Sequence, residues 1–256
     1  MVQILGISGK KQSGKNTTAN YIKGRILTET EMVRDFYITE TGELAVLTSD
    51  KTGVEDYGIL DVTRRDAGFV SYAESELWPF VKLYSFADGL KSLCMDFFGL
   101  SQAQAYGTDK QKNTKTKVKW EDVPTWENSS LNTNRGPMTA RELMQYFGTD
   151  IMRKMYEPVH VEHTVSKILS EQTQLAIIPD VRFPNEVKAI QKAGGKVVRL
   201  TRDKHKDSHS SECGLDPDNF DWNKFDLVIE NTKDLKHTLS EVEKMYHVFS
   251  RTGELC

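Results

Sequence analysis

The chain has 256 residues, which is long enough to bury a substantial hydrophobic core. Its 34 basic and 37 acidic side chains give a formal net charge of -3, so no overall field would attract nucleic acid or an anionic membrane. We therefore expect a small-molecule partner, with no nucleic acid and no membrane. The start of the chain has neither the basic region nor the cleavage site of a secretory signal, and no apolar run approaches 18 residues. Together with three scattered cysteines, which suit reduced thiols, these features predict a soluble cytoplasmic protein.

Five short apolar runs are typical of β-strands that are buried on both faces of a parallel sheet. They occupy residues 2–8, 80–86, 174–180, 196–201 and 226–230. Helical patterns alternate with these runs, and Gly194 stands where a helix ending at Ala193 would need a left-handed residue. The alternation predicts a single α/β domain over residues 1–256, with a parallel sheet of about five strands flanked by helices.

Two segments interrupt this alternation. Residues 28–79 contain alternating apolar positions around "ETGE", which predict a β-hairpin inside a β-rich insertion. Residues 101–137 lack periodicity and are too long for an ordinary connection, so we expect an irregular functional loop. Trp120 and Trp126 in this loop are expected to anchor it to the body, with stacking on a base as the weaker alternative.

The stretch "GKKQSGKNT", from Gly9 to Thr17, follows the first predicted strand and opens a helix. It matches the G-x-x-x-x-G-K part of the phosphate-binding loop, in which backbone N–H groups and a helix N-terminus surround a phosphate. Lys15 would add a mobile ammonium group for the β and γ phosphates. Because the motif lies between a predicted strand and a predicted helix, we favour a phosphate loop over an accidental glycine-rich turn.

Asn16 occupies the position that normally carries a magnesium-binding hydroxyl. Nucleoside monophosphate kinases commonly carry G-K-G-T, in which the hydroxyl arrives one residue later, and "GKNT" resembles that variant. Thr17, or alternatively Thr18, would then supply the hydroxyl, with Mg²⁺ held largely by water and by the substrates. Asn16 thus argues against a GTPase or a motor protein and for a small-molecule kinase.

A second polar cluster, in "IIPDVRFPNEV", falls at the carboxyl end of a predicted central strand. Asp180 and Arg182 lie at that end, and Glu186 begins the next helix. Ligands of open α/β sheets bind at this edge, which favours a functional role for the three side chains. The alternative is that Asp180 and Arg182 only pair with each other and hold the turn.

Seven stretches together resemble the phage deoxynucleoside monophosphate kinases in order and spacing. They are "GKKQSGKNTT", "YSFADGLK", "FGTDIMRKMY", "PDVRFPNE", "RLTR", "HSSE" and "DLVIEN". The resemblance implies a P-loop NTPase-type kinase fold with a lid over residues 203–222. It also implies transfer of the γ-phosphoryl group of ATP to a deoxynucleoside 5'-monophosphate, with ATP and Mg²⁺ as cofactors. A phage-encoded enzyme of this kind would act in the host cytoplasm.

The resemblance also assigns roles to individual residues. The residues implied to bind ATP are Gly9, Lys11, Gln12, Ser13, Gly14, Lys15, Asn16, Thr17 and Asn231. The residues implied to bind the deoxynucleotide are Lys10, Ser85, Phe86, Lys91, Arg141, Gly148, Thr149, Arg153, His160, Asp180, Arg182 and Glu186. Lys15, Arg141, Arg182 and Arg202 are the implied catalytic residues. Two positions depart from the family pattern, because Gly89 replaces a usual proline and His160 replaces an aromatic residue that would stack on the base.

Several alternatives stay open at this stage. Another small-molecule P-loop kinase, acting on dephospho-coenzyme A or phosphomevalonate, would share the loop, and so would a nucleotide-binding protein without turnover. His205, His209 and Cys213 fit no standard zinc spacing, so we expect a solvated lid loop and no protein-bound metal centre. The accepted bases and the oligomeric state are not predicted, and a homodimer is one option.

Overall fold

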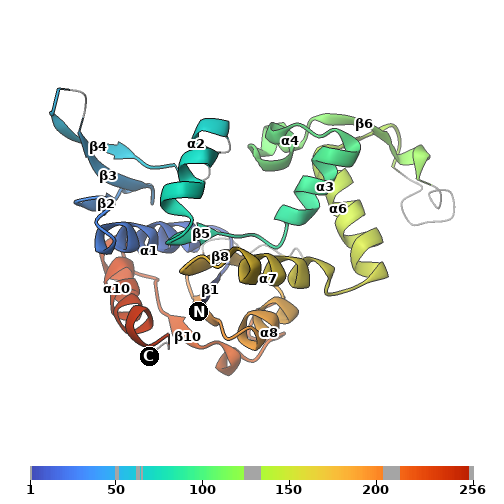
Figure 1. The fold of residues 1–256 in the computed structure, drawn as a ribbon. Helices are drawn as coiled ribbons and strands as arrows, with labels where there is room; N and C mark the ends of the chain where they lie inside the picture. Colours follow the sequence, from blue (N-terminus) through green and yellow to red (C-terminus); the bar gives the residue numbers. More distant parts are fainter. Residues whose placement is uncertain are drawn as a thin grey trace. The chain divides into compact units, whose positions relative to one another are not determined.

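The computed structural model describes residues 2–49, 52–61, 64, 66–123, 134–203 and 214–253. The chain forms two compact units, drawn in Figure 1. The larger unit comprises Met1–Ser85 and Val165–Cys256, and the smaller comprises Phe86–Thr164.

A five-stranded parallel sheet forms the centre of the larger unit, which confirms the predicted α/β fold. Its strands are β1 (Gln3–Ser8), β5 (Val81–Leu83), β8 (Leu175–Val181), β9 (Lys196–Leu200) and β10 (Leu227–Ile229). Their order across the sheet is β10-β9-β1-β8-β5. The strand that precedes the phosphate loop, β1, therefore lies in the middle, as its continuous apolar sequence requires.

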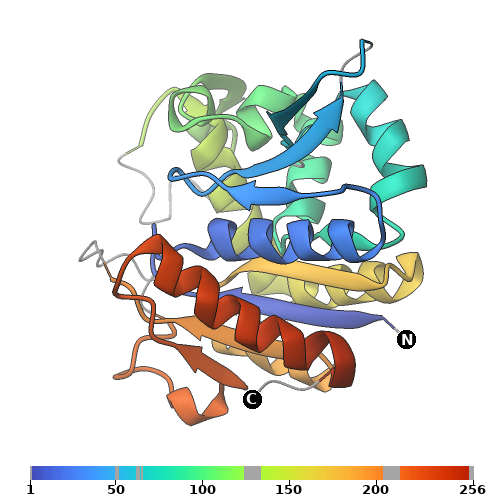
Figure 2. The ribbon, with the colours of Figure 1, turned by 90° about the vertical axis from the view of Figure 1, so that its left-hand side faces the viewer.

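Helices cover both faces of this sheet. Alternate residues of β1 point to opposite faces: Leu5 and Ile7 pack in the cluster that includes α1 (Lys15–Glu29) and α10 (Leu235–Thr252). Figure 2 shows α10 running along this face, beside α1. The helices α7 (Val159–Glu171) and α8 (Pro184–Lys192) complete the set, and a Cβ on Gly6 of β1 would meet Ile190 of α8 at 2.8 Å. The α8 helix ends as predicted, because Ala193 caps it and Gly194 follows with φ +82°.

The insertion contains the predicted hairpin. The strands β2 (Phe36–Ile38), β3 (Leu44–Ser49) and β4 (Glu55–Ile59) form an antiparallel sheet, with the β2–β3 turn at the "ETGE" sequence. One face of this sheet packs on α1, where the Phe36 ring lies against the bare backbone of Gly24. The insertion is not β-rich throughout, because α2 (Ala67–Tyr72) and the π-helix η1 (Ala73–Leu77) follow.

The smaller unit is largely helical around its own core. Its elements in chain order are α3 (Asp88–Phe98), α4 (Gln102–Tyr106), α5 (Asp109–Lys112), β6 (Lys115–Lys119), the 3₁₀ turn η2 (Trp120–Asp122), β7 (Pro137–Thr139), α6 (Ala140–Gln145) and the π-helix η4 (Tyr146–Arg153). The prediction of an irregular loop over residues 101–137 is therefore wrong for the described part of that segment. Trp120 is 6% exposed and packs edge-on against Tyr146, which confirms its anchoring role, whereas Trp126 lies outside the described residues.

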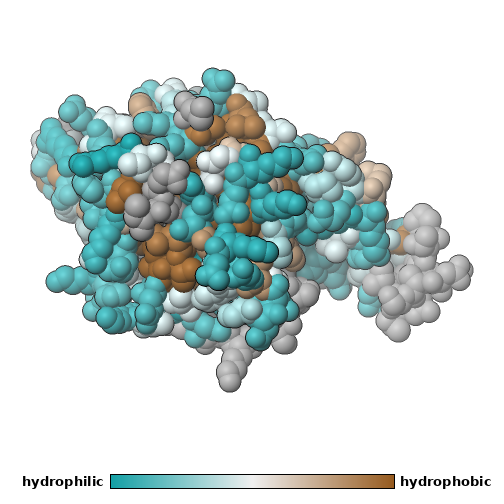
Figure 3. Space-filling model, turned by 90° about the horizontal axis from the view of Figure 1, so that it is seen from below, coloured by the Kyte–Doolittle hydropathy of each residue, from teal (hydrophilic) through white to brown (hydrophobic). Residues whose placement is uncertain are grey.

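The β10 edge of the main sheet is open to solvent among the described residues. A groove of about 390 Å³ runs beside it, between Val228 on the strand and Met245 on α10. Figure 3 views the molecule from below, where apolar surface is interspersed with hydrophilic side chains. No helix in the described part of the chain is long and apolar enough to cross a bilayer. A homodimer stays a prediction.

Candidate functional site

The carboxyl ends of four parallel strands bring the predicted residues of the larger unit to one edge. Ser8, the last residue of β1, is in register with Val181 of β8 and Arg199 of β9. Likewise Ile229 of β10 is in register with Leu200 of β9. The ends of these strands and the segments that follow them carry the phosphate loop, the Asp180 cluster, Arg202 and Asn231. This is the edge at which open α/β sheets bind ligands.

The backbone of the phosphate loop has the conformation that its glycines permit. Gly14 caps α1 in the left-handed region with φ +100°, and Gly9 has φ +159°. A Cβ on Gly9 would overlap the Ser13 hydroxyl, so no larger residue fits there. Gln12, at φ +59°, turns the loop between them. Lys11 and Gln12 are exposed, and Ser13 is buried.

Lys15 is the first residue of α1 and folds back over the loop. Its Nζ atom donates to the carbonyl oxygens of Gly9, at 2.7 Å, and Lys10, at 2.8 Å. The ammonium group therefore lies within the curve of the loop, at the positive end of the helix. A phosphate bound there would replace the two carbonyl oxygens as the hydrogen-bond acceptor of the Lys15 ammonium group.

The structure distinguishes between the two candidate hydroxyls. Thr18 is fully buried and its hydroxyl has no partner among the described residues, so it faces the core. Thr17 is only half buried, one turn into the helix, and Asn16 is exposed. Thr17 is therefore the hydroxyl that this loop can offer to a ligand.

The inserted hairpin contacts the phosphate-loop helix at this same residue. Gly42, in the β2–β3 turn, has φ +86°, and a Cβ built on it would overlap the Thr17 Oγ1 atom. The Asn20 amide, on the next turn of α1, donates to the Gly42 carbonyl at 2.9 Å. The sequence predicted the hairpin but gave no sign of where its turn would lie.

Asn231 joins the phosphate loop to the segment after β9. It is fully buried, and its side-chain amide donates to the Ser13 carbonyl at 2.7 Å. Its side-chain oxygen accepts from the backbone N–H of Arg202 at 2.8 Å. The Arg202 guanidinium in turn donates to the carbonyls of Asn231, at 2.8 Å, and Lys233, at 2.6 Å. In this conformation both side chains hold backbone segments together, and the ATP contact of Asn231 and the catalytic role of Arg202 stay predictions.

A charged cluster that the sequence did not reveal lies beneath the loop. Lys10 pairs with Asp216 at 2.6 Å, and the two side chains are 12% and 22% exposed. The Arg199 guanidinium is buried beside Asp216, donates to the Ser8 hydroxyl at 3.0 Å, and lies 5.0 Å from the Trp222 ring centroid. Trp222 begins the short 3₁₀ turn η5 (Trp222–Lys224). The cluster ties the start of the phosphate loop to the segment that follows residues 204–213.

The Asp180 cluster contains both of the arrangements that the sequence left open. Arg182 Nε donates to Asp180 at 2.7 Å, so the pair exists, yet both side chains are more than one-third exposed at the ligand edge. Glu186 is 3% exposed, and its carboxylate accepts the backbone N–H groups of Arg182, at 2.7 Å, and Phe183, at 3.1 Å. Glu186 thus caps α8 and orders the turn, while Asp180 and Arg182 are the more exposed members of the cluster, and their contact with a ligand stays a prediction.

The smaller unit carries the second group of predicted residues. Ser85 ends the larger unit just before Phe86, whose side chain is 6% exposed. The Lys91 ammonium lies 4.4 Å from the Tyr106 ring centroid. Arg141 donates to Asp109 at 2.5 Å and to Asn113 at 3.2 Å, and its side chain is 40% exposed. Thr149 is exposed and Arg153 half buried on η4.

His160 has a packing role in this unit. It is 6% exposed, and its Nε2 atom lies 3.1 Å from the Gly148 carbonyl. Burial is the main cause that lowers the His160 pKa, and the charge of Arg153 acts in the same direction. The ring therefore lies in the interior, so its contact with a base stays a prediction. The glycine at position 89 has a structural explanation as well, because a Cβ there would meet the His163 ring at 2.6 Å.

Half of the predicted lid over residues 203–222 lies outside the described residues. His205, His209 and Cys213 all lie in the segment 204–213. Among the residues that the structure describes, no cluster of three or more His, Cys, Asp or Glu side chains has the arrangement of a metal site.

Comparison with known proteins gives two matches. A family model for deoxynucleotide monophosphate kinase matches residues 86–242, which is more than half of the chain. A protein of Acanthamoeba polyphaga mimivirus is 28% identical over 172 residues, covering 62% of this chain and 79% of the relative. This relative is named as a deoxynucleotide monophosphate kinase, and that function was itself assigned by inference. The phosphate loop precedes the stretch matched by the family model and is an independent observation. The chain belongs to the deoxynucleotide monophosphate kinase family.

Proposed function

We propose that the protein transfers the γ-phosphoryl group of ATP to a deoxynucleoside 5'-monophosphate. The observation that carries the proposal is the position of Lys15, which lies inside a glycine-shaped loop at the N-terminus of α1 and the ligand edge of the sheet. Membership of the deoxynucleotide monophosphate kinase family supports the proposed substrate class. ATP as donor and the exact acceptor are the parts that experiment must test.

The donor phosphates would bind to the backbone N–H groups of the loop and to the Lys15 ammonium group. Mg²⁺ fits the oxygen donors present, because the half-buried Thr17 hydroxyl and the partly exposed Asp180 carboxylate are hard ligands of the kind that this ion prefers. When bound, the ion would neutralise charge on the β and γ phosphates. Its absence should therefore abolish transfer.

The acceptor needs positioning more than proton removal, because its attacking phosphate oxygen is already ionised at neutral pH. Arg182 at the sheet edge offers a planar guanidinium group that can grip a phosphate with two hydrogen bonds. Exchange of its bond with Asp180 for bonds to the acceptor would keep the guanidinium charge compensated. Arg141 and Arg153 are partly exposed on the smaller unit, and their contacts with the substrate stay predictions.

An ADP-release assay tests the proposal directly. The purified protein would be given ATP and Mg²⁺ with each of the four common deoxynucleoside monophosphates and with 5-hydroxymethyl-dCMP. We expect ADP release that depends on at least one of these acceptors and stops with EDTA. Dephospho-coenzyme A and phosphomevalonate serve as comparison acceptors. Activity with one of these two acceptors and with none of the deoxynucleotides would reject the proposal. ATP binding without ADP release on any acceptor would indicate a nucleotide-binding protein instead.

A further inference from the structure

One buried amine in the larger unit has no evident reason to be there. Lys23 lies on α1, two turns after Lys15, and is 2% exposed. Its Nζ atom forms no hydrogen bond with any of the described residues. Burying an amine without a partner costs free energy, whether the group is charged or neutral. A methionine would fill the same space without that cost. A bound ligand that accepts a hydrogen bond from the amine would offset the cost.

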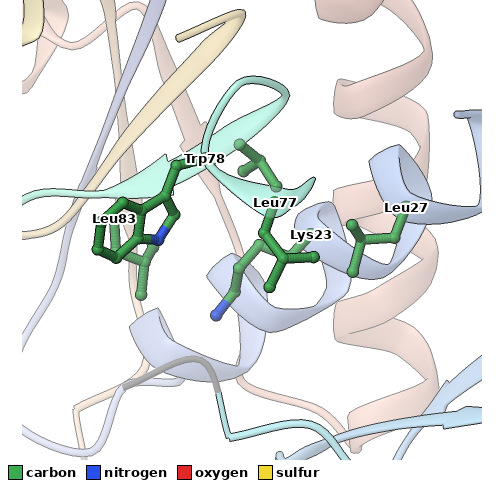
Figure 4. A pocket seen from close by; sticks show the side chains of 6 residues that line it. Lys23, Leu27, Leu77, Trp78 and Leu83 are labelled. Atoms are coloured by element: carbon green, nitrogen blue, oxygen red, sulfur yellow. The ribbon is translucent and has the colours of Figure 1, made fainter. Parts of the chain in front are cut away.

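The amine borders a small cavity. The other lining side chains are Leu27, Leu77, Trp78, Val81 and Leu83. Figure 4 shows the Lys23 side chain reaching into this space with its nitrogen at the tip. The nitrogen of the Trp78 ring lies on the edge of the ring that faces Lys23. The cavity measures about 20 Å³, which is room for one guest of about the size of a water molecule. A nucleotide or an inorganic phosphate is too large.

The chemistry of the lining selects among small guests. The Lys23 ammonium and the Trp78 indole N–H are both donors, and the remaining lining side chains are aliphatic. A water molecule would accept from the indole N–H and could donate to the neutral amine, but it would leave the charge of protonated Lys23 uncompensated. An anion accepts only, and it compensates the ammonium charge.

The charged groups near Lys23 leave room for such an anion. Burial is the largest influence and lowers the Lys23 pKa to about 7, while the negative charge of Asp61 acts in the opposite direction. On the other side of the lining, the Lys82 ammonium lies 3.9 Å from the Trp78 ring centroid and is paired with Glu171 at 2.7 Å. Near neutral pH the amine can therefore gain a proton readily if a counter-charge arrives with it.

We propose that this cavity is a proton-coupled binding site for one small monovalent anion of halide size, held by protonated Lys23 and the Trp78 indole N–H. The neutral amine takes up one proton from solvent as the anion enters, so the cavity stays electrically neutral and no other bond changes. Occupancy would stabilise the packing of α1, the helix that begins at the phosphate loop, against η1 and β5. The site is separate from the phosphate loop and does not depend on the proposed kinase activity.

Thermal unfolding in matched salts tests the proposal. The full chain would be melted at pH 6 and at pH 9.5, in sodium chloride and in sodium gluconate at equal ionic strength, since gluconate is too large to enter. At pH 6 we expect a higher melting temperature in chloride, and at pH 9.5 no difference. With the free anion at about ten times its dissociation constant, a site present only in the folded state lowers the unfolding equilibrium constant about 11-fold.

Three variants make the result specific. Lys23→Met removes the ammonium group, and it should lose the chloride response while remaining folded, because methionine suits the apolar lining. Trp78→Phe keeps the aromatic body without the N–H, and it should weaken the response. Lys244→Met removes one charge from an exposed position and should respond like the parent protein. Equal chloride responses in the parent and Lys23→Met would overturn the proposal, as would a response of the parent that is the same at both pH values.

Discussion

The Gly42 backbone lies directly against the Thr17 hydroxyl, and the inserted hairpin thereby contacts the first turn of the phosphate-loop helix. A side chain at residue 42 would have to displace Thr17, whose hydroxyl is the one proposed to meet Mg²⁺ or a phosphate. The hairpin turn is therefore part of the wall that fixes the position of this hydroxyl.

Replacing Gly42 with alanine should impair use of the phosphate donor. The new Cβ would overlap Thr17 Oγ1, and an alanine at φ +86° is also strained by roughly 1–2 kcal/mol. Gly53→Ala is the matched control, because Gly53 has φ +84° with open space around it and so reports the backbone strain alone. We expect both variants to melt at lower temperature and only Gly42→Ala to raise KM for ATP. Equal KM values in the two variants would show that the contact with Thr17 does not matter.

Lys15→Met should remove phosphoryl transfer and leave the fold intact. The Lys15 ammonium bonds two carbonyl groups of its own loop at the ligand edge, and it would stabilise charge in the transition state. We expect kcat to fall by about 10²-fold or more with an unchanged circular dichroism spectrum. Near-normal turnover in the folded variant would remove the phosphate-loop hypothesis.

The two residues after Lys15 should differ in importance. Asn16 is exposed and Thr17 half buried against the hairpin, so Asn16→Gly should keep substantial activity while Thr17→Ala loses more. Thr17→Ser restores the hydroxyl and should recover part of the loss. Measured kcat/KM values for the three variants give the order directly, and the reverse order would reject the comparison with G-K-G-T kinases.

Lys23 should make stability depend on pH. Its pKa is about 7 in the folded protein against 10.5 in the unfolded chain, so between these values the unfolded state binds more protons and the free energy of unfolding rises with pH. In a chloride-free buffer, Lys23→Met should be more stable at pH 7 by roughly 2–4 kcal/mol and should lose this slope. Urea unfolding from pH 6 to pH 10 measures both quantities, with Lys244→Met as the exposed control. A parent protein and Lys23→Met with parallel curves would show that the amine is not buried in solution.

The parts that the sequence predicted well are those with local signals. The five strands were visible because parallel strands buried on both faces carry unbroken apolar runs, and the phosphate loop because its glycines are spaced by backbone geometry. The helices α4 and α5 were missed because five and four residues are too few for a periodic pattern. Their capping boxes, Ser101 with Gln104 and Thr108 with Gln111, were the available signal.

Contacts across the chain were beyond a reading of local pattern. Asn231 meets the Ser13 carbonyl across 218 positions, and Asp216 meets Lys10 across 206. Neither pair shares a motif, because each bond exists only once the parallel strands bring their carboxyl ends together. The burial of Lys23 had a weak signal in the sequence, because this lysine stands among Ile22, Ile26 and Leu27 on the apolar side of α1.

Arg182→Ala should separate a substrate role from a structural one. The guanidinium group pairs with Asp180 at the ligand edge and is 37% exposed, so its removal leaves an exposed carboxylate and little lost packing. If Arg182 grips the acceptor phosphate, we expect weaker deoxynucleotide binding, a large fall in kcat/KM for the deoxynucleotide, and nearly unchanged affinity for ATP alone. Titration calorimetry with each ligand, alongside a melting curve, measures these quantities.

The matched control is Arg64→Ala, because Arg64 pairs through the same Nε atom with Asp66, two residues away along the chain, at 2.8 Å and at an exposed position. This variant should change neither affinity. Asp180→Asn adds a second comparison, since it breaks the ion pair and keeps the guanidinium group. If Arg182 only holds the turn, Arg182→Ala and Asp180→Asn should destabilise the protein alike and leave deoxynucleotide affinity intact. That outcome would remove Arg182 from the acceptor site, and with it the placement of the acceptor at the end of β8.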